Sequence, residues 1–510
     1  MQQLSGLDAA FLALDSPTST GHVGGVHVIE ATADDLGPLT LDQLTTLVGE
    51  RLHLVPPLRR RVVEVPFGID QPYWIEDGTF DLEFHVRELA LPAPGSMRQL
   101  TEQVARIHAR PLDRTRPLWE IYLIDGLEGG RQALYAKLHH AMIDGVAGQE
   151  VTAALLDLSP TGRDVPPAPP WAPDPVPGAV ELLARGATSL TFQPRRALRF
   201  ATELARSSPE LVGKLITPRL PGLGRLIGED TGVMFAAPVR APATPFNKSV
   251  GAHRRVAFAS VPMDAVKAVK NAAGLTVNDV VLAMCAGALR RYLIDHDALP
   301  EGPLVAAVPV SVRTTGGDGT LGNKVSLMLA ALPTQLDDPR ARLRVAHEAT
   351  ATAKDQHQAL PADLLADVYE FAMPALLGLA TRANARLRLL ERVNVFNLFI
   401  SNVPGPTVPL YIAGHQVVAS YPVSAITDGQ GLNITVISYL GGLNFGLIAD
   451  RGLVPDLDVL AGYLVDELAT LTAAAETVEA VDTLEASASV PDEPRKKARP
   501  RAARRPPRPR

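Results

Sequence analysis

The chain has 510 residues, of which 46% are hydrophobic and 20% are charged, and its formal net charge is −6. This length favours two or more domains, and the hydrophobic content is sufficient for large cores. Nine basic residues lie in the last sixteen positions, which leaves −15 for the remainder and argues against nucleic acid as a partner. The single cysteine, Cys285, excludes an internal disulfide framework and a cysteine-rich metal site.

Apolar runs are too short to span a bilayer, which requires about 18 residues or more. The longest runs are Val280 to Leu289 and Val325 to Leu332. The first residues lack the basic region of a secretory signal, and Asp8 and Asp15 interrupt the apolar stretch that follows. We therefore expect a cytoplasmic protein.

The first 158 residues alternate between strand-like and helix-like stretches, which predicts an α/β layer. The expected strands are His22 to Glu30, Pro72 to Glu76, Leu82 to Val86, Leu118 to Asp125 and Ala133 to His139. The expected helices are Leu41 to Leu52, Ser96 to Ala109 and Val146 to Leu156.

A connecting segment, residues 159–249, follows this layer. Eight of the eighteen residues from Pro160 to Pro177 are proline, which predicts an extended connector and a domain boundary. The segment from Glu181 to Gly228 contains eight Arg or Lys residues and three Glu residues, with apolar residues between them. This composition suits either a basic amphipathic helix on an anionic lipid surface or a helix whose apolar stripe packs on the protein.

A second α/β unit is expected over residues 250–475. Its predicted strands are Arg254 to Val261, Leu304 to Val312, Val325 to Leu332, Phe396 to Asn402, Leu432 to Ser438 and Asn444 to Ala449. Its predicted helices are Met263 to Ala272, Val277 to Tyr292, Pro339 to Ala353, Ala362 to Leu390 and Leu457 to Leu471. Gly274 closes the first helix, and Thr276 with Asp279 resembles a capping box. Residues 476–510 are expected to be a disordered basic tail.

The segment from Leu134 to Gly145 contains His139, His140 and Asp144 where an apolar strand breaks into a loop. A histidine can accept a proton from an alcohol at neutral pH and return it to a leaving group, so one imidazole can serve an acyl transfer. Neighbouring side chains of a strand point to opposite faces, so only one of the two histidines can face a given cavity.

The residues around this motif leave other interpretations open. Asp144 is interpreted as a structural residue that supports the motif, and Arg313 is a candidate ion-pair partner for it. Arg313 either anchors Asp144 or faces solvent. Two core histidines beside a helix-capping Asp would give the same pattern. A metal site would have only two ligands, His140 and Asp144. Cys285 lies among apolar residues, which favours packing over catalysis.

Several stretches resemble the bacterial bifunctional wax ester synthase/acyl-CoA:diacylglycerol acyltransferase family, within the wider group of CoA-dependent acyltransferases that carry His-His-x-x-x-Asp-Gly. They are Leu4 to Phe11, Asp81 to Arg87, Leu91 to Gly95, Arg110 to Glu120, Ile124 to Arg131, His139 to Gly145, Thr276 to Leu282, Pro309 to Arg313, Gly322-Asn323 and Ser401 to Pro406. The resemblance covers nearly the whole chain before the tail.

The resemblance implies an α/β fold of two chloramphenicol-acetyltransferase-like domains, with mixed sheets flanked by helices and an active-site tunnel at their interface. It also implies that His140 is the proton acceptor. His140 would deprotonate the hydroxyl of a diacylglycerol or a long-chain alcohol, which then attacks the thioester carbonyl of acyl-CoA.

The resemblance leaves the oxyanion donor open. Asn278, Ser401 and Asn402 are the candidate side chains. Asn278 and Asp279 also suit the start of a helix, where such residues act as caps. Ser401 and Asn402 precede Val-Pro-Gly-Pro and equally suit a turn.

The function expected from these residues is triacylglycerol synthesis by a diacylglycerol O-acyltransferase that uses long-chain acyl-CoA as substrate and no cofactor or metal. Wax ester synthesis from a fatty alcohol is the alternative within the same chemistry. Peptide-synthetase condensation domains share the histidine motif, but this chain has no carrier module. A non-catalytic protein that binds a lipid surface is the alternative from another class. The basic segments predict peripheral contact with a membrane or lipid droplet.

Overall fold

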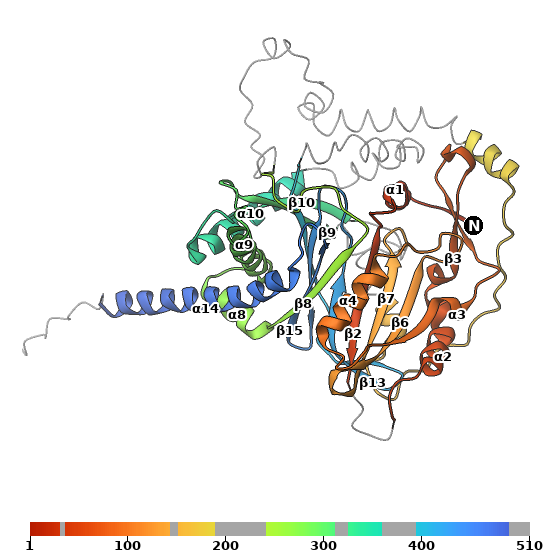
Figure 1. The fold of residues 1–510 in the computed structure, drawn as a ribbon, viewed down its shortest axis with the longest axis horizontal. Coiled ribbons are helices and arrows are strands. Elements are labelled where there is room, and N and C mark those ends of the chain that lie inside the picture. The colour runs from red at the N-terminus through yellow and green to blue at the C-terminus, as the bar shows by residue number, and fades with distance from the viewer. Residues whose placement is uncertain (31–35, 143–150, 189–240, 312–324, 360–393, 489–510) are drawn as a thin grey trace, which may run out of the picture.

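The computed structural model describes residues 1–30, 36–142, 151–188, 241–311, 325–359 and 394–488. Two mixed β-sheets lie side by side, each flanked by helices (Figure 1). The expected fold class of two α/β units with mixed sheets is confirmed. Predicted elements that fall on residues 143–150, 189–240 and 360–393 lie outside the described residues.

The first sheet has the strand order β12-β13-β2-β7-β6-β5, and only β5 and β6 are parallel. Its strands are β2 (His22–Ile29), β5 (Val86–Ala90), β6 (Trp119–Leu127), β7 (Arg131–His139), β12 (Leu410–Ile412) and β13 (His415–Val423). The helices of this unit are α1 (Gly6–Leu14), α2 (Leu41–Arg51), α3 (Leu82–His85) and α4 (Met97–His108). Both α2 and α4 begin with capping boxes, at Thr40 and Ser96, which satisfy backbone amides at each helix start.

A small antiparallel sheet, β1-β4-β3, lies beside the first unit. Its strands are β1 (Gln2–Gln3), β3 (Arg60–Val63) and β4 (Tyr73–Glu76). Short 3₁₀ turns connect the elements of this unit at Leu52–Leu54, Pro56–Arg59, Pro66–Gly68 and Glu128–Gly130.

The second sheet has the order β10-β9-β11-β14-β15-β8. Its strands are β8 (Arg254–Pro262), β9 (Leu304–Ser311), β10 (Val325–Leu332), β11 (Leu398–Val403), β14 (Leu432–Tyr439) and β15 (Gly442–Asp450). The helices of this unit are α8 (Met263–Ala272), α9 (Val277–Asp295), α10 (Pro339–Ala359) and α14 (Leu457–Ala488). Every residue from Asp279 to Leu289 is buried, so the longest apolar run of the chain forms the central core helix.

The apolar helices of the second unit were also compared with the requirements of a membrane span. Within the described ranges, no single helix combines the necessary length and apolarity. Helices α8 and α9 meet the requirements of length and apolarity only when they are taken together, and the chain bends by 101° between them.

Strand β13 joins the two units, because it belongs to the C-terminal part of the chain but pairs antiparallel with β2 in the first sheet. It also crosses close to β15: a Cβ atom built on Gly446 would lie 1.7 Å from the carbonyl oxygen of Pro422. One apolar cluster contains buried residues from both parts of the chain, among them Val26, Leu100, Val104, Val256, Val423 and Ile448. The two units therefore share a core as well as a sheet.

Two predicted segments have a different structure, and strands β1, β3, β12 and β13 were not predicted. The strand expected at Leu82 to Val86 begins as the helical turn α3, because the Asp81 carboxylate accepts a hydrogen bond from the Glu83 amide at 3.1 Å. The chain becomes extended only at Val86. Disorder is predicted from Glu476 onward, whereas α14 continues as a helix to Ala488. The last part of α14 is rich in Ala and Glu, which favour a helix even where no hydrophobic core packs against it.

Candidate active site

The two neighbouring histidines of the motif lie at the C-terminal end of β7, the central strand between β2 and β6. His139 is the last residue of β7 and pairs with His22 of β2. His140 begins the turn that follows. The His139 side chain is 1% exposed, whereas His140 is half-buried. The two imidazoles therefore have different surroundings.

Both ring nitrogens of His139 are engaged in hydrogen bonds. Its Nδ1 accepts a hydrogen bond from the Ala141 amide at 3.1 Å, and its Nε2 lies 3.0 Å from Oδ2 of Asp15. Because Nδ1 is an acceptor, Nε2 carries the hydrogen and donates it to the carboxylate. This pair of partners fixes both the tautomer and the orientation of the ring.

Asp15 follows α1 and is itself held by several donors. Its Oδ1 accepts a hydrogen bond from the Gly21 amide at 2.7 Å, and Arg114 Nη2 lies 3.1 Å from Oδ2. Burial opposes ionisation of this carboxyl, but the contacts with His139, Gly21 and Arg114 outweigh it and hold the pKa of Asp15 below its usual value. Asp15 is therefore an anion that faces the His139 ring.

Gly21 lies against both histidines. Its carbonyl accepts a hydrogen bond from the His140 amide at 2.8 Å. A Cβ atom at this position would lie 3.2 Å from two atoms of the His139 ring. The short loop from Asp15 to Gly21 thus holds the side chain of one histidine and the backbone of the other.

The His140 ring stacks on Phe11 of α1, with the ring centroids 4.2 Å apart and the planes inclined by 25°. Stacking on one face of the imidazole restricts its rotation, and the residue as a whole is half-buried. A ring held in this way can accept a proton from a group that approaches it.

A layer of buried polar side chains lies beneath His139. The ring of His22 meets the rings of His139 and His108 edge-on, each at 5.9 Å between centroids. Lys137 is fully buried, and its amine donates to the Ile107 carbonyl at 3.0 Å. Burial and the charge of Lys137 lower the pKa of His22 to about 3, and burial lowers the pKa of Lys137 to about 8. His22 is therefore neutral at pH 7.

The candidate oxyanion donors lie on the second sheet and its core helix. Asn278 lies in the first turn of α9 and is half-buried. Ser401 and Asn402 lie in the second half of β11, where they pair with Thr435 and Val436 of β14. Both are half-buried. Their part in the chemistry stays a prediction.

Asp279 has a clear structural role. It forms the predicted capping box with Thr276 at the start of α9, which is confirmed. Its carboxylate also accepts a hydrogen bond from the Thr350 hydroxyl at 2.6 Å and lies 2.9 Å from Nδ1 of His347. These partners tie α9 to α10. Asp144, Gly145 and Arg313 lie outside the described residues.

Sequence analysis did not predict three residues of this site. Asp15 is separated from His139 by 124 positions, and Phe11 and Gly21 also come from the first 21 residues. The stretch Leu4 to Phe11 contributes to the family resemblance, but its sequence alone indicates no contact with His140. No local pattern indicates that the loop after α1 returns to the end of β7, because that contact depends on the pairing of β2 with β7.

Comparison with protein families gives two matches on this chain. Residues 4–281 match the model of the wax ester synthase/diacylglycerol acyltransferase catalytic domain. Residues 321–472 match the model of the C-terminal domain of the same group of proteins.

Individual relatives agree with the family models. A Mycobacterium tuberculosis protein named "Probable diacylglycerol O-acyltransferase" is 37% identical over 473 residues, which cover 91% of this chain and 97% of the relative. The solved structure of a wax ester synthase/diacylglycerol acyltransferase from Marinobacter aquaeolei VT8 is 31% identical, with a TM-score of 0.64. That match covers 93% of this chain and 100% of the other.

A condensation domain of the calcium-dependent antibiotic synthetase has the same fold. It matches with a TM-score of 0.53 over 93% of this chain and 95% of its own, but with 17% identity. At this identity the likeness concerns the fold alone.

Proposed function

Because the chain belongs to the wax ester synthase/diacylglycerol acyltransferase family, we propose that it transfers the acyl group of a long-chain acyl-CoA to the hydroxyl of diacylglycerol and thereby makes triacylglycerol. His140 is the general base in this proposal. It removes the hydroxyl proton as the oxygen attacks the thioester carbonyl. The tetrahedral intermediate then collapses, the carbon–sulfur bond breaks, and the CoA thiolate takes the proton from the imidazolium.

The main support for this proposal is that His139 and His140 have different surroundings. His139 has both nitrogens engaged, by Ala141 and by Asp15, so its ring is a poor candidate for accepting a substrate proton. His140 is half-buried, and Phe11 stacks on one face of its ring. The base is therefore the second histidine, supported by the first.

The oxyanion must also be stabilised, and we propose Asn278, Ser401 or Asn402 as the donor. All three are half-buried, and their side chains can donate or accept hydrogen bonds. Loss of one well-placed donor costs about two to three orders of magnitude in rate. A tunnel between the two units, with acyl-CoA and the acceptor entering from opposite sides, would hold both substrates near His140 and limit hydrolysis of the thioester.

The acceptor is tested by giving purified enzyme labelled palmitoyl-CoA together with diolein or hexadecanol. We expect labelled triacylglycerol from diolein. Formation of wax ester alone would contradict the assignment of diacylglycerol and favour the alcohol as acceptor.

The base is tested with His140→Ala in the same assay. We expect a fall in kcat of about 10²- to 10⁴-fold, since general base catalysis contributes about this much. His296→Ala, a half-exposed histidine after α9, is the matched control and should retain activity. Unchanged triacylglycerol formation in the His140 variant would contradict its role as the base, and formation of neither ester by the wild type would favour a non-catalytic lipid-binding protein.

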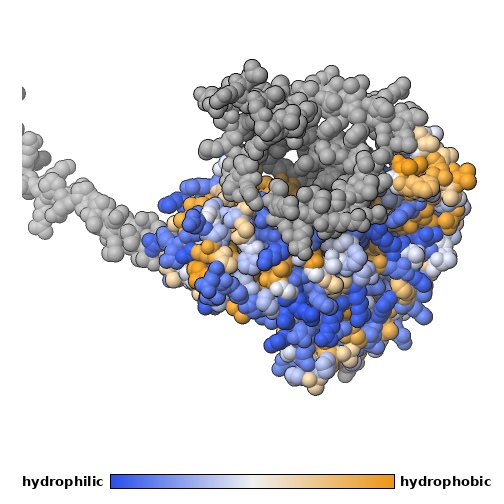
Figure 2. Space-filling model, turned by 45° about the horizontal axis from the view of Figure 1, so that its top comes forward, coloured by the Kyte–Doolittle hydropathy of each residue, from blue (hydrophilic) through white to orange (hydrophobic). Residues whose placement is uncertain are grey.

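We also propose that the protein binds a membrane or lipid-droplet surface peripherally. Phe67 and Val180 are 85% and 81% exposed. They lie on segments that pack together, because a Cβ atom on Gly186 would lie 2.8 Å from Ile69. Figure 2 shows a hydrophobic area at the right-hand edge of the described surface, where the helix of residues 179–188 lies in Figure 1. An exposed apolar area of this kind suits contact with lipid.

Flotation with liposomes tests this contact. We expect the protein to float with anionic liposomes and, less strongly, with neutral ones, and Phe67→Ser combined with Val180→Ser to weaken both. High salt should reduce only the electrostatic part. Indifference of flotation to lipid charge and to salt would contradict the electrostatic part, and failure to float with either kind of liposome would contradict surface binding.

A further inference from the structure

A cleft lies where the two units meet, between α4 of the first and β8 of the second. Its volume is about 220 Å³. The residues that line it are Thr101, Glu102, Ala105, Arg106, Arg254, Arg255, Val256, Arg451 and Asp458. Four of these nine residues are arginines, so the cleft has an excess of positive charge.

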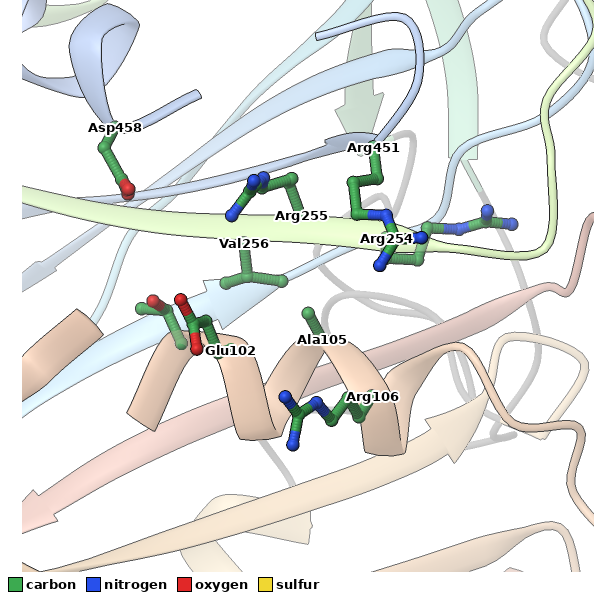
Figure 3. Close-up of a pocket in the computed structure, with 9 residues that line it drawn as sticks. Glu102, Ala105, Arg106, Arg254, Arg255, Val256, Arg451 and Asp458 are labelled. Carbon is green, nitrogen blue, oxygen red and sulfur yellow. The ribbon is translucent and has the colours of Figure 1, made fainter. Parts of the chain in front are cut away.

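The arginines come from three different elements. Arg106 is on α4, Arg254 and Arg255 begin β8, and Arg451 follows β15 (Figure 3). Among the residues that the structure describes, neither Arg106, Arg255 nor Arg451 forms an ion pair. The Nε of Arg255 is buried and has no hydrogen-bond partner in those same ranges. A buried donor without a partner costs free energy, which an anionic ligand would recover.

Two acidic residues also line the cleft, but each has a favourable neighbour elsewhere. Glu102 pairs with Arg98 on the preceding turn of α4, at 3.3 Å. Asp458 lies in the first turn of α14, where the helix dipole stabilises a negative charge. Neither acid approaches an arginine of the cleft within ion-pair distance in the described part of the chain.

The fourth arginine connects the cleft to the candidate active site. Arg254 is 8% exposed, and it donates hydrogen bonds to the Gly251 carbonyl at 2.7 Å and to the Thr18 carbonyl. Thr18 is three residues from both Asp15 and Gly21. At 3.8 Å for each step between Cα atoms, the backbone of Thr18 is within about 11 Å of each of them.

We propose that this cleft binds the phosphate groups at the nucleotide end of the acyl-CoA donor. The inference rests on the proposed function and adds a recognition site to it. Arginine is suited to this task because its planar guanidinium binds phosphate oxygens in pairs. The volume decides which part of the donor is held: pockets for whole ligands are about 300–1,000 Å³, so this cleft accommodates phosphates rather than the complete nucleotide.

The test compares two acyl donors on the full-length enzyme, palmitoyl-CoA and palmitoyl-pantetheine, which lacks the nucleotide. The variants are Arg255→Gln, Arg451→Gln and the two combined. We expect each substitution to raise KM for palmitoyl-CoA about tenfold, the usual value for one lost charge-assisted contact. The kinetic constants for palmitoyl-pantetheine should stay within twofold. Arg291→Gln, which removes an exposed arginine paired with Asp466, is the matched control.

Calorimetric titration with CoA supplies a readout that does not depend on turnover. We expect the double variant to bind CoA about a hundredfold more weakly than the wild type. Equal affinity of the two proteins, with equal KM for palmitoyl-CoA, would overturn the assignment. Equal losses with both donors would also overturn it, because a general structural defect would then be the cause.

Two further comparisons distinguish a failure of the proposed function from a failure of the phosphate site, and CoA from a lipid headgroup as the ligand. If the wild type transfers neither acyl group yet binds CoA in a way that depends on Arg255 and Arg451, the proposed function fails and the phosphate site stands. Flotation with phosphatidylglycerol vesicles distinguishes a lipid headgroup as the source of the phosphate. Loss of vesicle binding in the double variant, with CoA affinity retained, would overturn the assignment to CoA.

Discussion

At the scale of single residues, two imidazoles that are adjacent in the chain have different surroundings. His139 is enclosed between an amide and a carboxylate, whereas His140 rests on one aromatic face. A buried imidazole with both nitrogens engaged has a fixed tautomer and serves as a support. The loop that contains Asp15 and Gly21 is therefore as much a part of the site as the motif itself.

Asp15→Asn tests this support. The substitution keeps the size of the side chain but removes the charge that faces His139 and Arg114. We expect kcat to fall by about ten- to a hundredfold with little change in KM, because small misplacements of a catalytic group are costly. Unfolding free energy should fall by about 1–3 kcal/mol. Steady-state kinetics and denaturant unfolding measure the two effects.

Glu64→Gln is the control for this variant. Glu64 contacts the same Arg114 from the other side, at 3.3 Å, but is 69% exposed. Exposed pairs contribute little, so both readouts should stay near the wild type. If Asp15→Asn behaved in the same way as Glu64→Gln, Asp15 would have no positioning role.

The depressed pKa of His22 predicts a sensitivity to acid. Its pKa is about 3 in the folded protein and about 6.5 in the unfolded chain, so between these values the unfolded state binds the extra proton. The stabilising effect of the neutral ring is complete above pH 6.5 and is lost as the pH falls toward 3. We expect wild type to lose about 1.4 kcal/mol more than His22→Gln for each pH unit below 6.5. Urea unfolding at pH 7.0, 6.0 and 5.0 measures this difference, and parallel curves would contradict it.

Much of the chemistry at this scale follows from sequence, since the His-His-x-x-x-Asp-Gly spacing and the alternation of strand side chains indicate a base at the end of a strand. The identity of its supporting anion does not follow. In the sequence, Asp15 is only a charged residue that interrupts an apolar stretch. Its contact with His139 arises because the pairing of β2 with β7 places the loop of Asp15 beside the end of β7. Contacts between residues this far apart depend on sheet topology, which a local pattern does not contain.

At the scale of elements, helices with apolar periodicity and strands with a strongly apolar sequence were predictable. The bounds of α8 and β10 match the prediction at both ends. Strand β13 was not predicted. The register shifts between Val417 and Ala419, so buried positions change phase within the strand and the period of two is broken. A search for a regular period of two therefore misses the strand that joins the units.

Two glycine substitutions test the crossing of β13 and β15. Gly446→Ala places a methyl group 1.7 Å from the Pro422 carbonyl, so the strands must separate, at a cost of about 3 kcal/mol or more. Gly462 lies on the exposed face of α14, and an added Cβ atom would meet nothing within 4 Å beyond its own stretch of helix, so Gly462→Ala should stabilise by about 0.5–1 kcal/mol. Thermal unfolding of both variants gives shifts of opposite sign. A neutral Gly446→Ala would show that the crossing tolerates separation.

At the scale of the whole molecule, the shared strand and the shared apolar cluster predict one cooperative unfolding transition. Scanning calorimetry should give a single peak with equal calorimetric and van't Hoff enthalpies. Leu100→Ala, at a fully buried position of the shared cluster, should lower the midpoint of that peak without splitting it, because removal of a buried Leu costs about 2–5 kcal/mol. Two separate peaks in either protein would contradict this coupling.

The crossover also constrains recombination between members of the family. A chimera with its junction in the proline-rich segment after residue 159 would combine β2 of one parent with β13 of the other. The side chains on either side of that seam would then come from different sequences. Functional hybrids should arise more readily when the exchanged N-terminal fragment carries along residues 410–423, which are remote in the chain but belong to the same sheet.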